Sequence, residues 1–263
     1  MKFALAQMTS SNVLEKNLAD VLSRLNIAKQ RGADAVLFPE NVFFIGDAKD
    51  YARVGRQIIQ WGYIALIQEA AKKLSIAVLI GSYIEFDEKT SSLFNTSLWI
   101  DERGVVLAKY RKIHLFDVIT PSGQRYQESK NFRAGRRLTH FRWRGLHLGL
   151  TICYDVRFPE QFQRLAKLGV QGIMVPSAFT QETGQAHWHT LLRARAIENF
   201  SYIFAPAQSG THATGRKTYG HSLAINPWGE VKLDAKKKRG IHVIDVDFSD
   251  VARWRKQFGW KKK

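Results

Sequence analysis

Short apolar runs alternate with amphipathic stretches along the first third of the chain. Apolar residues recur at helical spacing in the longer stretches, and Gly32 closes the first of them. The shorter apolar runs have the length and flanking residues of strands. The predicted elements are strands at 3–7, 35–38 and 76–83, and helices over 14–28 and 61–74.

Residues 94–110 break this alternation. Two strand-like runs, 94–100 and 105–110, flank the turn-forming residues 101–104, which predicts a hairpin. The later predicted elements are strands at 146–153, 172–176, 202–207, 222–226 and 241–246, and helices over 159–168 and 185–199.

Helices alternating with strands, but with hairpins among them, predict an α/β protein built as a layered sandwich of mixed sheets rather than a parallel barrel. Residues 130–145 and 208–220 are polar and without period, and we expect them to be loops around a site.

The length and composition are typical of a globular protein. The chain has 263 residues, of which 45% are hydrophobic, enough to bury a sizeable core. No repeat or linker-like tract divides it, so we expect one domain over 1–263 with a basic tail from about 250. The single cysteine excludes an internal disulfide, and no apolar run resembles a signal peptide or a membrane span. These features predict a cytoplasmic protein without membrane contact.

The formal net charge of +17 is large. Such a charge can serve nucleic-acid binding or an anionic surface. Residues 231–263 hold eleven Lys/Arg against four Asp/Glu, but the remaining excess is spread thinly over the chain. We therefore expect no nucleic-acid partner. A basic nucleic-acid-binding or scaffold protein is the alternative of a different class.

Three reactive side chains lie at or just past predicted strand ends: Glu40, Lys112 and Cys153. Catalytic groups in α/β sheets gather at such ends. Cys153 lies on a strand-to-helix connection, a place where a nucleophile is exposed on a fixed backbone. The following helix N-terminus and a nearby ammonium group should lower the thiol pKa. Taken alone, however, Cys153 fits an inert buried core cysteine better than a nucleophile.

The three side chains together indicate amide hydrolysis. A thiolate can attack an amide carbonyl and form a thioester. Glu40 can take the thiol proton, pass it to the leaving amine and later activate water. Lys112 can stabilise the oxyanion with a backbone N–H near Tyr154. Cys–His catalysis with His114 is the alternative arrangement.

The segments 38–40, 110–116 and 152–160 resemble, in order and content, three motifs of the nitrilase superfamily of carbon–nitrogen hydrolases. The resemblance implies a four-layer αββα fold and a Glu-Lys-Cys triad, with Glu40 as base and acid, Lys112 as oxyanion stabiliser and Cys153 as nucleophile. It also implies a second glutamate, matched by Glu128, that orients Lys112 and positions the substrate amide.

Segments 176–180, 183–198 and 219–230 resemble the Nit branch of that superfamily, which contains deaminated glutathione amidases and ω-amidases. The resemblance implies hydrolysis of the side-chain amide of a small α-keto acid, with deaminated glutathione as the first expectation. The alternatives are α-ketoglutaramate, another aliphatic amide or an N-carbamoyl compound. Segment 117–126 departs from the family's usual linker beside the pocket, so it bears on substrate choice.

Four further side chains are candidates for substrate binding. Arg157, four residues past Cys153, can hold a substrate carboxylate bidentately, or can pair with Glu160 instead. Tyr154, Phe179 and Thr180 follow strand ends and are expected to line the same pocket.

We expect neither a cofactor nor a metal ion. His187 and His189 are two residues apart and would not share one helical face, and no cluster in the sequence completes a zinc set. The family fold usually pairs two sandwiches, so the resemblance also implies a homodimer or higher homo-oligomer acting on a small amide.

Overall fold

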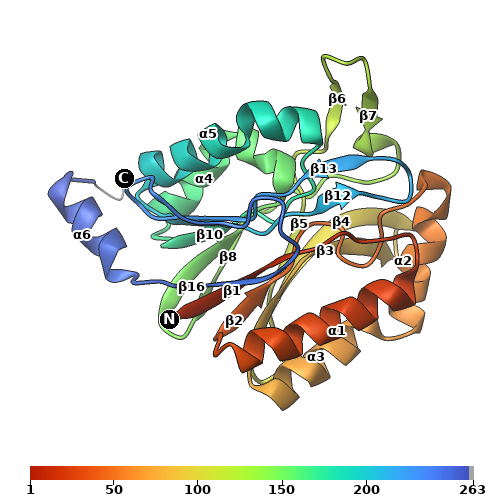
Figure 1. Ribbon diagram of the computed structural model, residues 1–263, viewed down its shortest axis with the longest axis horizontal. Coiled ribbons are helices and arrows are strands. Elements are labelled where there is room, and N and C mark those ends of the chain that lie inside the picture. The colour runs from red at the N-terminus through yellow and green to blue at the C-terminus, as the bar shows by residue number, and fades with distance from the viewer. Residues whose placement is uncertain (261–263) are drawn as a thin grey trace.

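A computed structural model describes residues 1–260. Two six-stranded sheets lie face to face in it (Figure 1). The first sheet has the order β16-β1-β2-β3-β4-β5 and mixes parallel with antiparallel pairs. Its strands are β1 (Lys2–Gln7), β2 (Ala35–Leu37), β3 (Ala77–Asp87), β4 (Ser92–Ile100), β5 (Val106–Arg111) and β16 (Gly240–Asp245).

The second sheet is mixed as well, with the order β15-β14-β11-β10-β9-β8. Its strands are β8 (Thr139–Trp143), β9 (Leu146–Leu150), β10 (Gly172–Met174), β11 (Tyr202–Ala205), β14 (Leu223–Ile225) and β15 (Val231–Asp234). Two small hairpins stand apart from both sheets: β6 (Asp117–Ile119) with β7 (Arg125–Gln127), and β12 (Ser209–Thr211) with β13 (Lys217–Tyr219).

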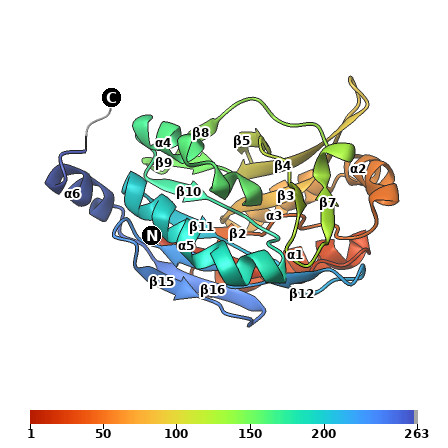
Figure 2. The same ribbon diagram turned by 90° about the horizontal axis from the view of Figure 1, so that it is seen from above.

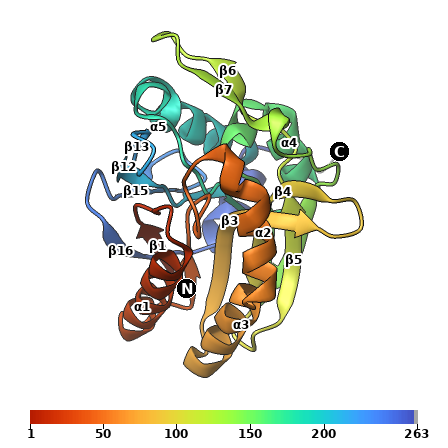
Figure 3. The same cartoon turned by 90° about the vertical axis from the view of Figure 1, so that its right-hand side faces the viewer.

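Helices cover the outer face of each sheet, which completes four layers and confirms the predicted αββα sandwich (Figures 1 and 3). On the first sheet lie α1 (Leu14–Gln30), α2 (Tyr51–Gln60) and α3 (Tyr63–Leu74); on the second lie α4 (Pro159–Lys167) and α5 (Gln181–Asn199). A sixth helix, α6 (Ser249–Gln257), follows β16. Among the described helices, none is both long and apolar enough to cross a membrane.

The alternation within strands explains the layering. In β1, Phe3 and Leu5 point into the core between the sheets, while Ala4 points toward the outer helices. Strands buried on both faces read as continuous apolar runs, which is why the sequence marks them clearly. Across the core, the Phe3 ring stacks on Phe204 of β11 with centroids 4.7 Å apart. This contact fixes one sheet against the other.

Four expectations about elements need correction. Residues 139–143, expected in a loop, form β8, and the loop expected at 208–220 contains the β12–β13 hairpin. Helix α2 was not predicted. The expected tail from about 250 is in part helix α6, which buries Val251, while 261–263 lie outside the described residues.

Candidate active site

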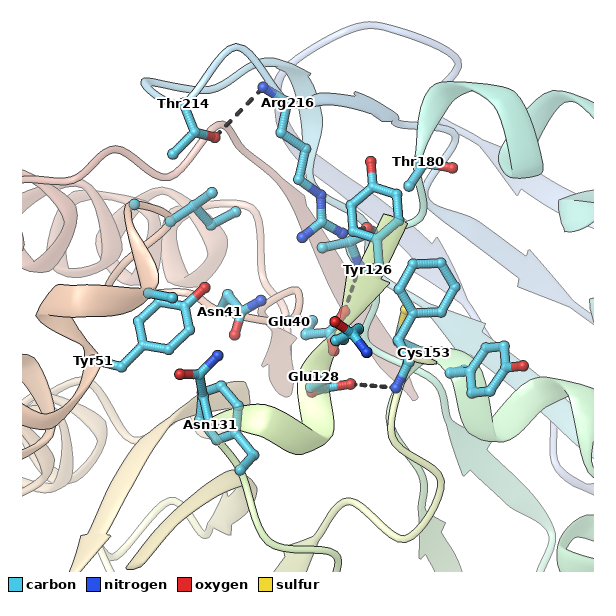
Figure 4. Close-up of a pocket in the computed structure, with 18 of the residues that line it drawn as sticks. Glu40, Asn41, Tyr51, Tyr126, Glu128, Asn131, Cys153, Thr180, Thr214 and Arg216 are labelled. Carbon is cyan, nitrogen blue, oxygen red and sulfur yellow. Dashed lines mark hydrogen bonds between the residues drawn. The ribbon is translucent and has the colours of Figure 1, made fainter. Parts of the chain in front are cut away.

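Strand ends from both sheets bring the predicted catalytic residues together. Glu40 follows β2 and Lys112 follows β5, both in the first sheet, whereas Cys153 follows β9 in the second. All three line one cavity, together with Glu128 (Figure 4). The juxtaposition predicted from the sequence is therefore present.

The Lys112 ammonium group joins the two glutamates. Its Nζ donates to Glu40 Oε1 at 2.9 Å and to Glu128 Oε2 at 2.8 Å, and the side chain is 2% exposed. Glu128 Oε2 also accepts from the Phe116 N–H at 2.7 Å. Buried ion pairs whose remaining donors and acceptors are hydrogen-bonded in this way are held in one geometry. Removing either the lysine or a glutamate would leave an uncompensated buried charge.

Asn95 of β4 is a member of this cluster that the sequence reasoning missed. Its Nδ2 donates to Glu40 Oε1 at 3.0 Å and to Glu128 Oε1 at 2.9 Å. The amide thus joins the two carboxylates by a second bridge, beside the one that the ammonium group makes. The available signal in the sequence was a polar run, 95–97, that interrupts the apolar residues of the predicted strand 94–100.

The backbone of Glu40 is held as firmly as its carboxylate. Gln208 Nε2 donates to the Glu40 carbonyl at 2.9 Å, and the Ala178 N–H donates to Glu40 Oε2 at 2.8 Å. Beside it, a Cβ on Gly81 would lie 1.9 Å from the Phe38 carbonyl oxygen. Only glycine allows β3 to pass this close to the segment that carries Glu40.

Burial and neighbouring charges act in opposite directions on the pKa values of Glu40 and Lys112. Burial alone would raise the pKa of Glu40, but Lys112 and the hydrogen bond from Cys153 hold that pKa below its usual value. Burial alone would lower the pKa of Lys112, but Glu128 and Glu40 together raise it above its usual value. Glu40 is therefore a carboxylate and Lys112 an ammonium group at neutral pH.

Cys153 occupies a strained turn, with φ at +49°, at the start of the 3₁₀ turn Cys153–Arg157. Its N–H donates to the Pro176 carbonyl at 3.0 Å, which fixes the turn to the strand end after β10. A non-glycine residue in this region costs of order 1–3 kcal/mol and is typical of functional sites.

The expected lowering of the thiol pKa is wrong. Burial and the neighbouring Glu40 carboxylate raise the pKa of Cys153 well above its usual value, and Lys112 offsets this only in part. Helix α4 begins only at Pro159, beyond the 3₁₀ turn, so its N-terminus is not directly at the thiol. The resting residue is a thiol whose proton faces a carboxylate able to accept it.

Asp155 connects the nucleophile turn to the lysine segment. It is fully buried, and its Oδ2 accepts from the Ile152 N–H at 2.8 Å and from Tyr110 Oη at 2.7 Å. Its Oδ1 accepts from the His114 N–H at 3.0 Å and lies 2.7 Å from His114 Nδ1. His114 thus belongs to the hydrogen-bond network around Asp155, and it does not line the cavity.

We expect Tyr110→Phe to lower the free energy of unfolding by about 1–3 kcal/mol. The change removes a donor to Asp155 and an acceptor for Gln161 and the Ile113 N–H, all inside the protein. Urea unfolding measures the effect. Tyr63→Phe is the matched control, because the Tyr63 hydroxyl is also buried but has no hydrogen-bond partner among the described residues. Equal losses in the two variants would contradict the bracing role.

The cavity in front of Cys153 has a volume of about 510 Å³. Tyr154, Phe179 and Thr180 line it, as the sequence predicts. The β6–β7 hairpin closes one side through residues 124–127, so the segment expected to border the pocket does so at its C-terminal end. Helix α2 adds Tyr51, which the sequence analysis did not single out (Figure 4).

Arg157 lies outside this lining. Its guanidinium group contacts His187 Nδ1 at 3.2 Å and lies 5.7 Å from the ring centres of Tyr154 and Phe179, two residues that line the cavity. The alternative pairing with Glu160 is also not what the structure shows, since the contact is to His187. Arg157 therefore does not supply the guanidinium group that we expected in the cavity for binding a substrate carboxylate.

Arg216, from the β12–β13 hairpin, supplies a guanidinium group inside the cavity instead (Figure 4). Its Nη2 donates to the Ala178 carbonyl at 2.5 Å, and its Nε is buried without a partner among the described residues. The backbone of Ala178 thus contacts Glu40 through its N–H and Arg216 through its carbonyl. No motif marked Arg216 in the sequence, because its position depends on a hairpin that was expected to be an irregular loop.

The fold and the site together define a carbon–nitrogen hydrolase. The family model described as carbon-nitrogen hydrolase matches residues 2–256, and the chain belongs to this family. The deaminated glutathione amidase of Synechocystis sp. is 37% identical over 258 residues, which cover 97% of this chain and 94% of that protein. Omega-amidase NIT2 of Homo sapiens is 35% identical, with 97% and 92% covered. The chain is accordingly an amidase of this family.

Solved structures agree. The NitFhit protein of C. elegans superposes with a TM-score of 0.92 at 37% identity, covering 99% of this chain and 64% of that one. A mutant amidase from Nesterenkonia sp. AN1, with the acetamide moiety of fluoroacetamide added covalently at its active site cysteine, gives a TM-score of 0.83 at 26% identity, covering 99% and 97%. In that protein, therefore, the active site cysteine is the residue that reacts with a small amide compound.

Proposed function

We propose that the chain hydrolyses the side-chain amide of a small α-keto acid, with deaminated glutathione as the first substrate to test, through a thioester on Cys153. The observation that carries the proposal is that Cys153, Glu40 and Lys112 share one cavity with the guanidinium group of Arg216. The first three groups suit amide chemistry, and the fourth suits an acidic substrate.

In the acylation step, Glu40 takes the thiol proton as Cys153 attacks the amide carbonyl. Lys112 Nζ stabilises the oxyanion, together with a backbone N–H next to Tyr154. Glu40 then returns its proton to the leaving amine, and the C–N bond breaks to give the thioester. Glu128 keeps Lys112 in place through the 2.8 Å contact.

In the deacylation step, Glu40 takes a proton from water, which attacks the thioester. Collapse of the second tetrahedral intermediate returns the proton to sulfur and releases the acid. One carboxylate therefore serves both steps, which requires its ionised resting state. The lowered pKa of Glu40 fits that requirement.

The charges of the lining support a substrate with carboxylates. Deaminated glutathione carries two, one on the keto acid and one on its terminal glycine, and α-ketoglutaramate carries one. Arg216 and Glu40 both contact the backbone of Ala178, and this placement suits a keto-acid carboxylate a few bonds from the scissile amide. Arg125, on the exposed β6–β7 hairpin, also lines the cavity and suits the more distant carboxylate.

A panel of amides tests the proposal. We expect deaminated glutathione and α-ketoglutaramate to be hydrolysed with higher kcat/KM than neutral aliphatic amides and N-carbamoyl amino acids. Arg216→Lys should raise KM for the keto-acid amides by roughly 10-fold or more, because a bidentate contact becomes a point contact, and leave neutral amides little changed.

Arg157→Lys is the matched control, since Arg157 does not line the cavity, and it should change KM little for both classes of amide. A preference for neutral amides in the wild-type enzyme would reject the substrate proposal but not the amidase activity. A uniform KM change across both classes in Arg216→Lys would reject the role of that side chain.

Three further proposals concern the protein as a whole. We infer a single domain over 1–263, a cytoplasmic setting and a homodimer or higher homo-oligomer without nucleic acid. The one cysteine is a free thiol, which suits a reducing compartment. Exposed Trp228 and Phe258, beside Trp254, form an aromatic patch suited to contact between subunits.

A further inference from the structure

Two histidines and an aspartate from three separate elements meet beside α5, outside the cavity. His189 lies in α5, His221 in the turn before β14, and Asp234 at the end of β15. His221 Nδ1 is 3.0 Å from Asp234 Oδ1, and His189 Nε2 is 3.3 Å from Asp234 Oδ2. One ligand atom from each residue lies within 4.8 Å of the other two.

We propose that His189, His221 and Asp234 form a binding site for a divalent transition metal ion, with Zn²⁺ as the best match. Two imidazoles and a carboxylate are ligands that zinc uses, and three protein ligands leave a fourth position for water. The spacing of His187 and His189 in the sequence gave no indication of this set, because the other two ligands come from distant strands.

The separations already suit tetrahedral coordination. Zinc bonds of about 2.0–2.1 Å to nitrogen and oxygen place neighbouring ligand atoms roughly 3.3 Å apart. Both nitrogens lie at about that distance from one oxygen, Asp234 Oδ2: 3.2 Å for His221 Nδ1 and 3.3 Å for His189 Nε2. Only the nitrogen–nitrogen edge has to adjust, and small side-chain rotations supply that. The nitrogens that now face the carboxylate are the ones that would bind the metal.

The surroundings prepare the ligands. The Lys236 N–H donates to Asp234 Oδ1 at 2.7 Å, and the Tyr219 ring stacks on His221 at 4.4 Å, so both side chains are oriented from outside the set. All three side chains are partly exposed, which leaves an entry path.

The location suggests what the metal would do. Helix α5 packs against the second sheet, whose edge strand is β15 (Figure 2), and a shared ion would tie the helix to that edge strand. The N-cap of α5 is Thr180, a cavity-lining residue. The ion would therefore stabilise the cavity wall without taking part in the reaction. This inference does not depend on the identity of the amide substrate.

Zinc binding to the full chain tests the site. The protein is stripped with chelator and titrated calorimetrically with ZnCl₂ in a Cys153→Ala background, which removes the thiol as a competing ligand. We expect about one zinc ion per chain. His189→Ala and Asp234→Asn should each weaken binding by at least the roughly 10–100-fold that loss of an outer contact costs. His187→Ala, on the same helix but outside the set, should bind as the parent does.

Melting temperatures of the wild-type chain and the same three variants provide a second readout. Zinc should raise the melting temperature of the wild type and of His187→Ala, and leave that of His189→Ala and Asp234→Asn unchanged. Absence of stoichiometric binding, or equal affinity in parent and His189→Ala, would reduce the cluster to a hydrogen-bond network and overturn the proposal. If Asp234→Asn fails to fold, His189→Ala alone decides.

Discussion

Cys153→Ala is expected to lower amide turnover on the order of 10⁴-fold or more, because no other group can form the thioester. Cys153 is the only cysteine in the chain, so no neighbouring thiol can replace it. Mass spectrometry of the wild-type protein mixed with substrate and quenched should show an acyl adduct on the peptide that contains residue 153. The adduct should be absent from the variant.

Cys153→Ser is the companion variant, since a hydroxyl keeps a proton for Glu40 but is a weaker nucleophile. It should turn over slowly, above the alanine variant and far below the wild type. The strained turn is carried by the backbone hydrogen bond to Pro176, so both variants should fold, as circular dichroism would verify. An alanine variant that turns over within about tenfold of the wild type would disprove a thioester route.

Glu40→Gln is expected to reduce kcat by roughly 10²–10⁴-fold, with losses in acylation and in deacylation, because one carboxylate acts in both. Single-turnover experiments separate the two rates: the appearance of adduct reports the first, and its decay reports the second. Glu69→Gln makes the same change of charge at an exposed site and should leave both rates unchanged. A loss confined to one half-reaction would show that another group serves the other.

The pH profile of kcat/KM identifies the base independently. Activity requires the Glu40 carboxylate, so it is present above the pKa of Glu40 and lost as the pH falls through it. Since Lys112 holds that pKa below the usual value of about 4.3, the acidic limb should lie below pH 4.3. A limb near pH 6.5 would indicate a histidine base, for which His114 would be the first residue to examine.

Hydrophobic patterns within short segments of the sequence predicted most of the fold. Strands buried on both faces appear as continuous apolar runs, and the order of helices and strands gave the mixed α/β sandwich. The prediction failed where polar residues alternate with apolar ones in short edge elements. β8, for instance, exposes His140 and Arg142 and buries Phe141, so its composition resembles that of a loop.

The site residues that could be predicted are those that directly follow strands. Glu40, Lys112 and Cys153 each follow a strand, and parallel strands place their ends at one edge. Asn95 and Arg216 could not be found this way. The first lies inside a strand, and its value depends on the register that places it between two carboxylates. The second depends on a hairpin fold that brings it back over Ala178.

The direction of the thiol pKa shows a further limit of sequence reasoning. A helix N-terminus and a lysine near a cysteine predict a thiolate, but the balance depends on how deep the sulfur lies and how close the carboxylate comes. Both quantities are tertiary. The outcome matters for reactivity, because a protonated resting thiol that needs Glu40 should react slowly with general alkylating agents and preferentially with a bound amide.

The division of the catalytic groups between two sheets has a consequence for evolution. Glu40 and Lys112 move with one sheet and Cys153 with the other, so the reacting atoms are aligned across the interface that the Phe3–Phe204 stack helps to hold. Substitutions in that interface change the alignment even when they lie far from the substrate. Selection for rate therefore acts on the shape of the apolar core, and an inherited core limits which distant changes a lineage can accept.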